Sequence, residues 1–491
     1  MNMFFLGQFL LLSLMAPSFA AGSIAGEKER KTYEMLLASP MRPMAIVQGK
    51  LLAALCHLAV LVFCSLPIVM LCLPLGGVSP YEVLGTYIAM AASVITFGMI
   101  SLACSSYFTR TPASLVVSYL LILPLALLAV LLYNLLEMAA GFRLLVLAGL
   151  FPAGCAVVCA ALMAAISRRL LHPPDLGAEA QEAVDLEQEQ REATGMVIHQ
   201  DQWPDRMFAP AKRTDLLPDG TNPVYDKEMR SELFGHGTLM LRIVIQSSMG
   251  MALVVMAACL FIYPERAAWY TGYVLLFNML VGPVFSAGSV TSERERATLE
   301  LLLTTTLSPL QILAGKLVSS LRVSCVLTSF LVWPILLAWV MPPWTYWQDT
   351  MTLVGYVAII LVTSLTTTTL AMFCSVVFRK TTVSMITSYL LIVLLFGLPV
   401  AVKIFAEVFY PVSASDWARE LLFTSPFAAT FSLPLTVGAA ELTGSAAPGV
   451  PIDTGWGAHT AAAFLAYYLV VDTVLIWVML RLFNVRWRVA Q

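Results

Sequence analysis

Long apolar runs separated by short polar segments make up most of this chain. Eleven of these runs approach or exceed the roughly 20 residues that a helix needs to cross a bilayer. They lie near positions 2–21, 44–74, 84–108, 114–135, 144–166, 239–263, 269–291, 310–341, 351–378, 383–402 and 459–482. They do not alternate between apolar and polar residues, as the strands of a membrane barrel would. The pattern predicts an all-α polytopic membrane protein with about 11 transmembrane helices.

The composition supports a membrane protein and argues against a soluble one. Of the 491 residues, 59% are hydrophobic and 12% are charged, whereas a soluble domain carries about 25% charged residues. The formal net charge of -2 gives no indication of nucleic-acid binding. All nine cysteines fall inside the apolar runs, where small polarizable side chains serve packing, so we expect neither disulfides nor a metal site.

The first 21 residues have the apolar centre and small residues of a signal peptide. A signal peptide also needs a positively charged beginning, and no Lys or Arg precedes Lys28. Because the basic residues follow the apolar run, we expect this run to be a retained membrane span whose basic end is cytoplasmic.

One charged segment occurs twice. The first copy, "GSIAGEKERKTYEMLLASP", runs from Gly22 to Pro40, and the second, "GSVTSERERATLELLLTTT", runs from Gly288 to Thr306. Residues 17–55 align with 283–321 without a gap, and "SYLLI" occurs at both 118–122 and 388–392. We therefore predict two tandem membrane halves in parallel orientation, at 1–171 and 238–491. The polar stretch 172–237 between them is expected to be a cytosolic linker that ends in an amphipathic connecting helix.

The two predicted halves are not complete copies of each other. The second begins with "NPVYDKEMRSELFGHG" and a further apolar run, and the counterpart of Asn222 would lie upstream of Met1. Either the first half lacks its leading span, or translation starts upstream; we favour the second explanation. Reading the upstream DNA in frame distinguishes the two.

The basic residues predict which side of the membrane each segment occupies. Lys28, Arg30, Arg294 and Arg296 flank the charged segments, whereas the loops "PLGGVSPYE" and "MPPWTYWQDT" contain no Lys or Arg. The positive-inside rule then places both charged segments, the linker and the C-terminus in the cytoplasm. We expect a multi-pass protein of the plasma (inner) membrane.

Each charged segment is expected to be a helix that contacts another protein. From Gly26 to Ala38, the spacing would pair Glu27 with Lys31 and Arg30 with Glu34. An interfacial connector that only rests on lipid is the alternative for a single copy. Acidic side chains are poor partners for the anionic cytoplasmic leaflet, and the segment occurs twice, so we favour a protein contact.

The doubled pattern E-x-E-R-x-T-x-E-x-L-L, followed by P-x-x-x-x-x-G-K, resembles the loop after the second span of ABC-2 type transporter permeases. In that family the loop forms a coupling helix that sits in a groove of the ATP-binding subunit. "NPVYDKEMR" also resembles the family's amphipathic connecting helix. The family often has Gly before the Thr, where this chain has Lys31 and Ala297, so we expect a more regular helix here. The resemblance implies that the residues that couple to the ATPase are Glu27, Glu29, Arg30, Thr32, Glu34, Glu293, Glu295, Arg296, Thr298 and Glu300.

The resemblance also implies a function. The chain contains no G-x-x-x-x-G-K-[ST], so we expect a transporter permease that is not itself an enzyme and binds no cofactor. Separate ABC ATPase subunits, two copies, would bind ATP and Mg and drive export through the bilayer. The alternative is a secondary transporter with internal repeats, although no chain of intramembrane ionisable residues is evident.

Overall fold

The computed structural model describes residues 2–72, 80–108, 111–135, 145–171, 222–230, 246, 249–250, 252–253, 267–340, 350–409, 421–433 and 454–487. The chain divides into two compact units. Unit 1 comprises Met1–Lys212 and Glu232–Val244, and unit 2 comprises Arg213–Ser231 and Ile245–Gln491. The predicted linker at 172–237 lies outside the described residues except for 222–230, as does most of the predicted span at 239–263.

Among the described residues, nine helices are long and apolar enough to cross a membrane. They are Gly7–Glu29, Pro43–Pro67, Val83–Tyr107, Val146–Leu170, Tyr270–Glu295, Pro309–Leu337, Thr350–Val377, Thr381–Lys403 and His459–Val485. The predicted span at 114–135 lies within a tenth helix, α6 (Thr111–Leu135), whose described apolar part is shorter. The prediction of an all-α polytopic membrane protein is confirmed.

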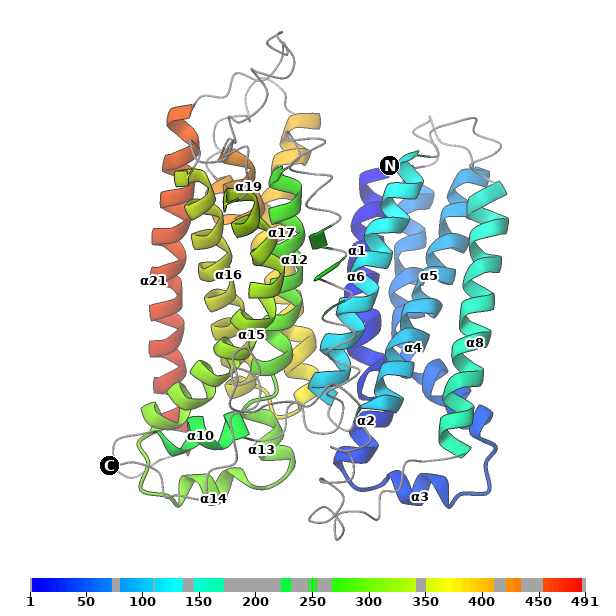
Figure 1. The fold of residues 1–491 in the computed structure, drawn as a ribbon, viewed down its shortest axis with the longest axis horizontal. Helices are drawn as coiled ribbons and strands as arrows, with labels where there is room; N and C mark the ends of the chain where they lie inside the picture. The colour runs from blue at the N-terminus through cyan, green and yellow to red at the C-terminus, as the bar shows by residue number, and fades with distance from the viewer. Residues whose placement is uncertain are drawn as a thin grey trace. The chain divides into compact units, whose positions relative to one another are not determined.

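Unit 1 is a bundle of helices that run side by side (Figure 1). It contains α1 (Asn2–Ala20), α4 (Pro43–Cys72), α5 (Pro80–Tyr107), α6 and α8 (Phe151–Leu171). The helix α5 lies at its centre, because it packs against α1, α4, α6 and α8. The short helices α2 (Gly22–Glu29) and α3 (Tyr33–Leu37) connect α1 to α4, and α3 lies across one end of the bundle.

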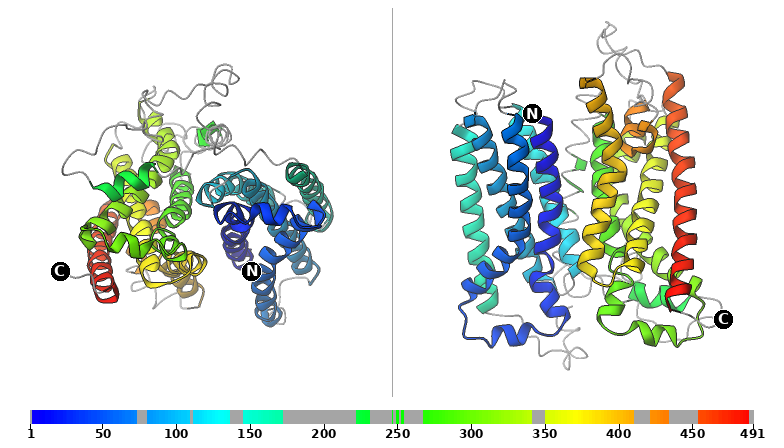
Figure 2. Two further views of the ribbon diagram at one scale, coloured as in Figure 1. Left: turned by 90° about the horizontal axis from the view of Figure 1, so that it is seen from below. Right: turned by 180° about the vertical axis from the view of Figure 1, so that it is seen from behind.

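Unit 2 repeats this arrangement with α16 at the centre (Figures 1 and 2). Its long helices are α12 (Ala267–Ser286), α15 (Pro309–Val340), α16 (Thr350–Val377), α17 (Thr381–Phe409) and α21 (Thr454–Trp487). The short helices α13 (Thr291–Glu295) and α14 (Leu299–Leu303) connect α12 to α15. The amphipathic helix α10 (Pro223–Arg230) packs against α15, and α19 (Pro426–Ser432) packs against α12, α16 and α21.

Several helices begin where the sequence supplies a helix-start signal. Pro43, Pro80, Pro223 and Pro309 are the first residues of α4, α5, α10 and α15, a position where proline costs no hydrogen bond. Asn222 caps α10, because its side-chain oxygen accepts the backbone N–H of Val224 at 3.0 Å.

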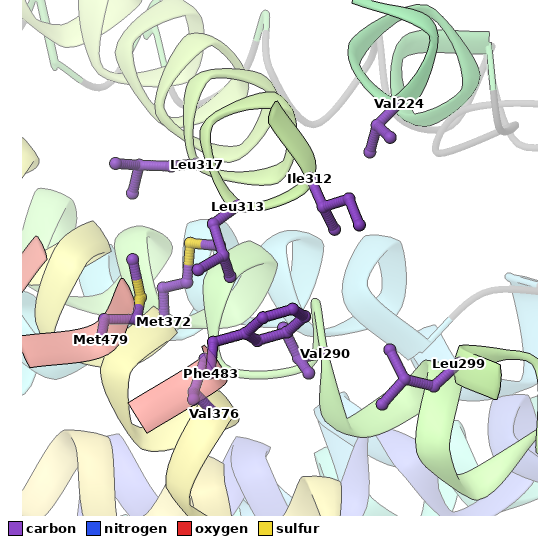
Figure 3. Packing of buried hydrophobic residues seen from close by; sticks show 10 residues of the cluster. All are labelled: Val224, Val290, Leu299, Ile312, Leu313, Leu317, Met372, Val376, Met479 and Phe483. Carbon is purple, nitrogen blue, oxygen red and sulfur yellow. The ribbon is translucent and has the colours of Figure 1, made fainter. Parts of the chain in front are cut away.

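The two units have corresponding hydrophobic cores beneath their charged segments. The core of unit 2 (Figure 3) is formed by Val224, Val290, Leu299, Ile312, Leu313, Leu317, Met372, Val376, Met479 and Phe483. The core of unit 1 is formed by Ile24, Tyr33, Val47, Leu51, Met99, Leu102, Ile166 and Leu170. Repeat-related pairs such as Ile24 with Val290 and Val47 with Leu313 occupy these cores. Each charged segment is therefore packed onto the bundle through its apolar side.

Candidate functional site

Each charged segment contains two short helices and not the single helix that was predicted. In unit 1, α2 ends at Glu29 and α3 begins at Tyr33, and Lys31 between them has a φ of 57°. In unit 2, α13 and α14 are separated in the same way at Ala297, whose φ is 56°. The expectation that replacing glycine would make the helix regular was wrong. The chain adopts the left-handed conformation here despite the side chain, at a cost of about 1 kcal/mol.

Hydrogen bonds close each of these left-handed turns. The backbone N–H of Thr32 donates to the Glu27 carbonyl at 3.0 Å, and that of Lys31 donates to the Lys28 carbonyl at 3.1 Å. Thr298 donates in the same way to the Glu293 carbonyl at 2.9 Å. This pairing of the last carbonyls of a helix is the Schellman arrangement. It satisfies backbone groups that a helix end leaves without partners.

The threonines also fix the acidic side chains that precede the turns. Thr32 donates its hydroxyl to the Glu27 carboxylate, and Thr298 donates its hydroxyl to the Glu293 carboxylate. The other Glu27 oxygen pairs with Lys50 at 2.6 Å. Glu27 is thus bonded to the beginning of α4, and the predicted Glu27–Lys31 pair is replaced by these contacts.

Unit 2 carries a larger version of this ion pair. Lys316 lies 2.6 Å from Glu228 and 3.4 Å from Glu293, and Lys227 lies 3.0 Å from Glu293. Glu228 and Lys227 belong to α10, so this network connects α10 to both α13 and α15. Lys316 is only 2% exposed. A buried ammonium of this kind is stable only when carboxylates compensate for its lost hydration.

The second acidic residue of each segment caps a membrane helix. The Glu29 carboxylate accepts the backbone N–H of Thr111, the first residue of α6, at 2.8 Å. The Glu295 carboxylate accepts the backbone N–H of Thr381, the first residue of α17, also at 2.8 Å. A carboxylate at a helix N-terminus is stabilised by the helix dipole as well as by the hydrogen bond. These contacts join the charged segment to a helix far away in the sequence.

Further bonds attach each segment to the end of the central helix. The Ser105 hydroxyl accepts the backbone N–H groups of Ile24 at 3.0 Å and Ala25 at 2.8 Å. The Ser375 hydroxyl accepts the corresponding groups of Val290 at 2.9 Å and Thr291 at 3.1 Å.

The basic residue of each segment completes this attachment. Lys28 donates to the Ser106 carbonyl at 2.6 Å, and its counterpart Arg294 donates to the Val376 carbonyl at 2.6 Å. Ser105 and Ser375 belong to blocks that the repeat aligns, but the sequence did not indicate that they bond to the charged segments.

The predicted coupling residues thus separate into two groups. Six of them bond within their own unit, namely Glu27, Glu29, Thr32, Glu293, Glu295 and Thr298. The side chains of Arg30, Glu34, Arg296 and Glu300 are exposed, and so is that of Glu295. Next to them lie two exposed apolar side chains that were not predicted, Met35 at 68% and Leu301 at 69% exposure. The repeat aligns these two residues, which is the signal that could have identified them.

The comparison with known families decides what this repeated arrangement is. The family model described as ABC-2 family transporter protein matches residues 4–147 and 143–484. The chain belongs to the ABC-2 transporter family. No curated relative and no solved structure gives a significant match. As an ABC-2 permease, the chain is a membrane component of a transporter and is not itself a catalytic enzyme. The family normally works with ABC ATPase subunits.

The ABC-2 permease also contains an ionisable group that was missed in its predicted spans. Asp472 on α21 is 2% exposed and accepts hydrogen bonds from Thr366 at 3.0 Å and Thr369 at 2.8 Å on α16. In unit 1, Thr96 aligns with Thr366, and its hydroxyl lies 3.6 Å from the Cys159 sulfur on α8. The acid is therefore particular to unit 2. The sequence signal was an aspartate within the apolar run 459–482.

Proposed function

We propose that this ABC-2 permease couples ATP hydrolysis by two separate ABC ATPase subunits to the export of a substrate across the plasma membrane. ATP and Mg would bind to those subunits and not to this chain. The observation that supports the proposal is the pair of exposed tips at α3 and α14, each with the same chemistry. Such a surface, an apolar side chain beside charged ones, is typical of a protein contact.

Each tip would contact one ATPase subunit. The tip of unit 1 consists of Arg30, Glu34 and Met35, and that of unit 2 consists of Arg296, Glu300 and Leu301. Met35 or Leu301 would enter an apolar pocket of the ATPase, while the neighbouring charges select the orientation. The exposed carboxylates Glu34 and Glu300 of the predicted coupling set lie beside these apolar side chains.

The six residues that bond within their own unit would transmit the movement. Glu29 connects α2 to α6, and Glu27 connects it to α4 through Lys50. Glu295 connects α13 to α17 in the same way. A displaced tip would therefore move several membrane helices together, because packed helices shift as rigid bodies. This is the mechanical step by which closure of the ATPase subunits would change access to the substrate path.

Co-purification with the ATPase tests the docking. The double variants Glu34→Lys with Glu300→Lys, and Met35→Asp with Leu301→Asp, should each reduce recovery of the ATPase by at least about tenfold, because an apolar contact or an attraction is replaced by an uncompensated charge. The matched control is Tyr81→Asp with Met351→Asp, which alters side chains that are 74% and 86% exposed at the beginning of α5 and α16, the ends of these helices that lie away from the tips. An intact complex in both tip variants would contradict the proposal.

Asp472 favours the alternative, a secondary transporter. A buried carboxylate within a membrane span is a common proton carrier. In this chain both of its oxygens accept threonine hydroxyls, an arrangement that also holds α16 and α21 together. Substrate uptake into vesicles that depends on ATP and the ATPase subunits supports the first function. Uptake driven by a pH gradient without ATP would support the second.

A further inference from the structure

Buried polar side chains form a layer inside unit 2, where α12, α15 and α16 meet. The layer consists of Asn278 on α12, Ser324 and Thr328 on α15, and Ser364 and Thr367 on α16, each of them at most 3% exposed. We call these five residues the polar layer. Two of the helices approach closely here, because a Cβ atom added at Gly282 of α12 would lie 2.6 Å from the Thr367 hydroxyl oxygen.

The hydrogen bonds of the polar layer determine how the Asn278 amide is oriented. Thr328 donates its only hydroxyl proton to the Ser324 carbonyl at 2.8 Å. Its oxygen can then only accept, and it accepts the side-chain N–H of Asn278 at 3.1 Å. The other end of the amide, Asn278 Oδ1, is buried and has no hydrogen-bond partner among the described residues. A buried amide oxygen without a donor costs free energy, so this atom calls for a hydrogen-bond donor.

The hydroxyl groups of the polar layer are suited to hold such a donor. Ser324 Oγ lies 3.4 Å from Ser364 Oγ, across the contact between α15 and α16. Thr367 donates its hydroxyl to the Ser364 carbonyl at 3.1 Å, which leaves its oxygen able to accept. A water molecule donates two hydrogen bonds and accepts others, and buried waters occupy sites with several polar partners. None of the five side chains is charged, so the layer suits a neutral guest better than an ion.

Unit 1 shows that the fold does not require a polar layer at this place. The repeat aligns the five residues with Leu12, Leu58, Val62, Val94 and Phe97. The correspondence follows the helices, since α5 and α16 begin and end at residues related by the repeat. All of these apolar residues except Val62 are 6% exposed or less. Apolar packing therefore holds the same three helices together in unit 1, and the polar layer of unit 2 serves a different purpose.

We propose that the polar layer binds a water molecule between α12, α15 and α16, and that unit 2 changes its helix contacts at this layer during transport. The water donates one proton to Asn278 Oδ1 and the other to a serine hydroxyl oxygen. When α12 shifts, the water exchanges its partners and no buried polar group is left unbonded. The apolar layer of unit 1 resists such a shift, because its side chains fill one another's space. The role in transport rests on the proposed function, whereas the binding of water does not.

X-ray radiolytic footprinting of the full-length protein in nanodiscs tests the site, because hydroxyl radicals formed from a bound water oxidise the nearest side chains. Cys325 is the reporter, since its sulfur lies 3.8 Å from Ser364 Oγ. Oxidation of Cys325 should fall at least about threefold in Asn278→Leu with Thr328→Val, because the water then has too few polar partners. Thr430→Val is the matched control and should leave the oxidation unchanged. Like Thr328, Thr430 is buried and donates to the carbonyl four residues before it.

Equal oxidation of Cys325 in the wild type and in the double variant would overturn the water site. A high-resolution density map of the wild-type protein is an independent measurement that requires no variant. We expect density for a water within hydrogen-bonding distance of Asn278 Oδ1. A map that shows ordered water elsewhere inside unit 2 but none beside this atom would also overturn the site.

ATP-dependent transport into vesicles, measured with the ATPase subunits present, tests the role of the layer. The variant Asn278→Leu with Thr328→Val replaces both partners of a hydrogen bond by apolar side chains of similar shape, so its thermal stability should be unchanged or higher. Transport should fall at least about tenfold, because a tightly packed apolar layer resists rearrangement. Thr430→Val should retain transport. Full transport in a stable double variant would overturn the role in movement. A wild type that transports without ATP would overturn the proposed function, and the footprinting would still decide the water site.

Discussion

The carboxylate of Glu295 accepts a hydrogen bond at 2.8 Å from the backbone N–H of Thr381, the first residue of α17. Glu29 and Thr111 reproduce this bond at 2.8 Å in unit 1. An acidic residue of the charged segment thus caps a membrane helix in each unit. Because both units share this geometry, Glu29 and Glu295 have a mechanical role that is separate from any contact with a partner.

Removing this cap should loosen the start of α17. Glu295→Ala should reduce the free energy of unfolding by about 1 kcal/mol and increase amide exchange at the first turn of α17. Glu295→Gln should have a smaller effect, since its side-chain oxygen still accepts. Hydrogen–deuterium exchange of the purified protein measures this. Glu300→Ala, at an exposed position of the same segment, is the control, and equal exchange in the two alanine variants would show that Glu295 caps nothing.

Glycine should make the protein more stable than a residue with a side chain does at the two positions of positive φ. Ala297→Gly should increase the free energy of unfolding by about 1 kcal/mol, because glycine adopts a positive φ without steric cost. Ala38→Gly should be neutral or destabilising, since Ala38 has an ordinary φ of -72°. Thermal unfolding in mild detergent compares the two. A loss of stability in Ala297→Gly comparable to that in Ala38→Gly would argue against the left-handed turn.

The two repeat-related lysines should differ in their contribution to stability. Lys316→Met removes a cation that is 2% exposed and leaves Glu228 and Glu293 with less compensation, so we expect a loss of about 3 kcal/mol. Lys50→Met alters a pair that is 25% and 31% exposed, so we expect a loss of less than about 1 kcal/mol. Denaturant unfolding of the two variants measures the difference. Equal losses would mean that α10 does not reinforce the ion pair of unit 2.

The role of Asp472 can be separated into packing and transport. Asp472→Asn keeps an acceptor oxygen, whereas Asp472→Leu removes both acceptors of the Thr366 and Thr369 hydroxyls. We expect Asp472→Leu to lower the free energy of unfolding by about 1 to 2 kcal/mol and Asp472→Asn by less. If the aspartate only joins α16 to α21, Asp472→Asn should retain ATPase stimulation by the permease within about twofold. A complete loss of transport in a stable Asp472→Asn protein would favour proton coupling.

The repeat was visible in the sequence because both copies retain the same residues at the same spacing. From Glu27 and Glu293 through Gly49 and Gly315, identity alone indicated two related halves and a shared charged segment. The partners of these residues could not be predicted in the same way. Glu29 bonds to Thr111, and Lys28 bonds to the Ser106 carbonyl. These bonds join positions far apart in the sequence, and local spacing contains no information about them.

The turn at Lys31 and Ala297 shows why a helical pattern can mislead. The spacing of Glu27, Lys31 and Glu34 fits one helix, and neither copy contains glycine or proline at the break. The break is stabilised by a local bond from the Thr32 hydroxyl to the Glu27 carboxylate and by a bond from the more distant Lys50 ammonium to the same carboxylate. Together they outweigh the cost of a left-handed residue, which is about 1 kcal/mol.

The sequence by itself determined the class of this protein, its helical spans and its internal duplication. The length of each apolar run and the identity between the two copies can be read directly from the sequence. An apolar segment that spans a bilayer must also satisfy its own backbone hydrogen bonds, which a helix does. Only the tertiary structure decided which charged residues bond to other helices of their own unit, which side chains form the exposed tips, and that α10 packs on α15. Those outcomes depend on which helix ends lie next to each other in the folded protein. The residues at these ends are far apart in the sequence, so no periodic pattern connects them.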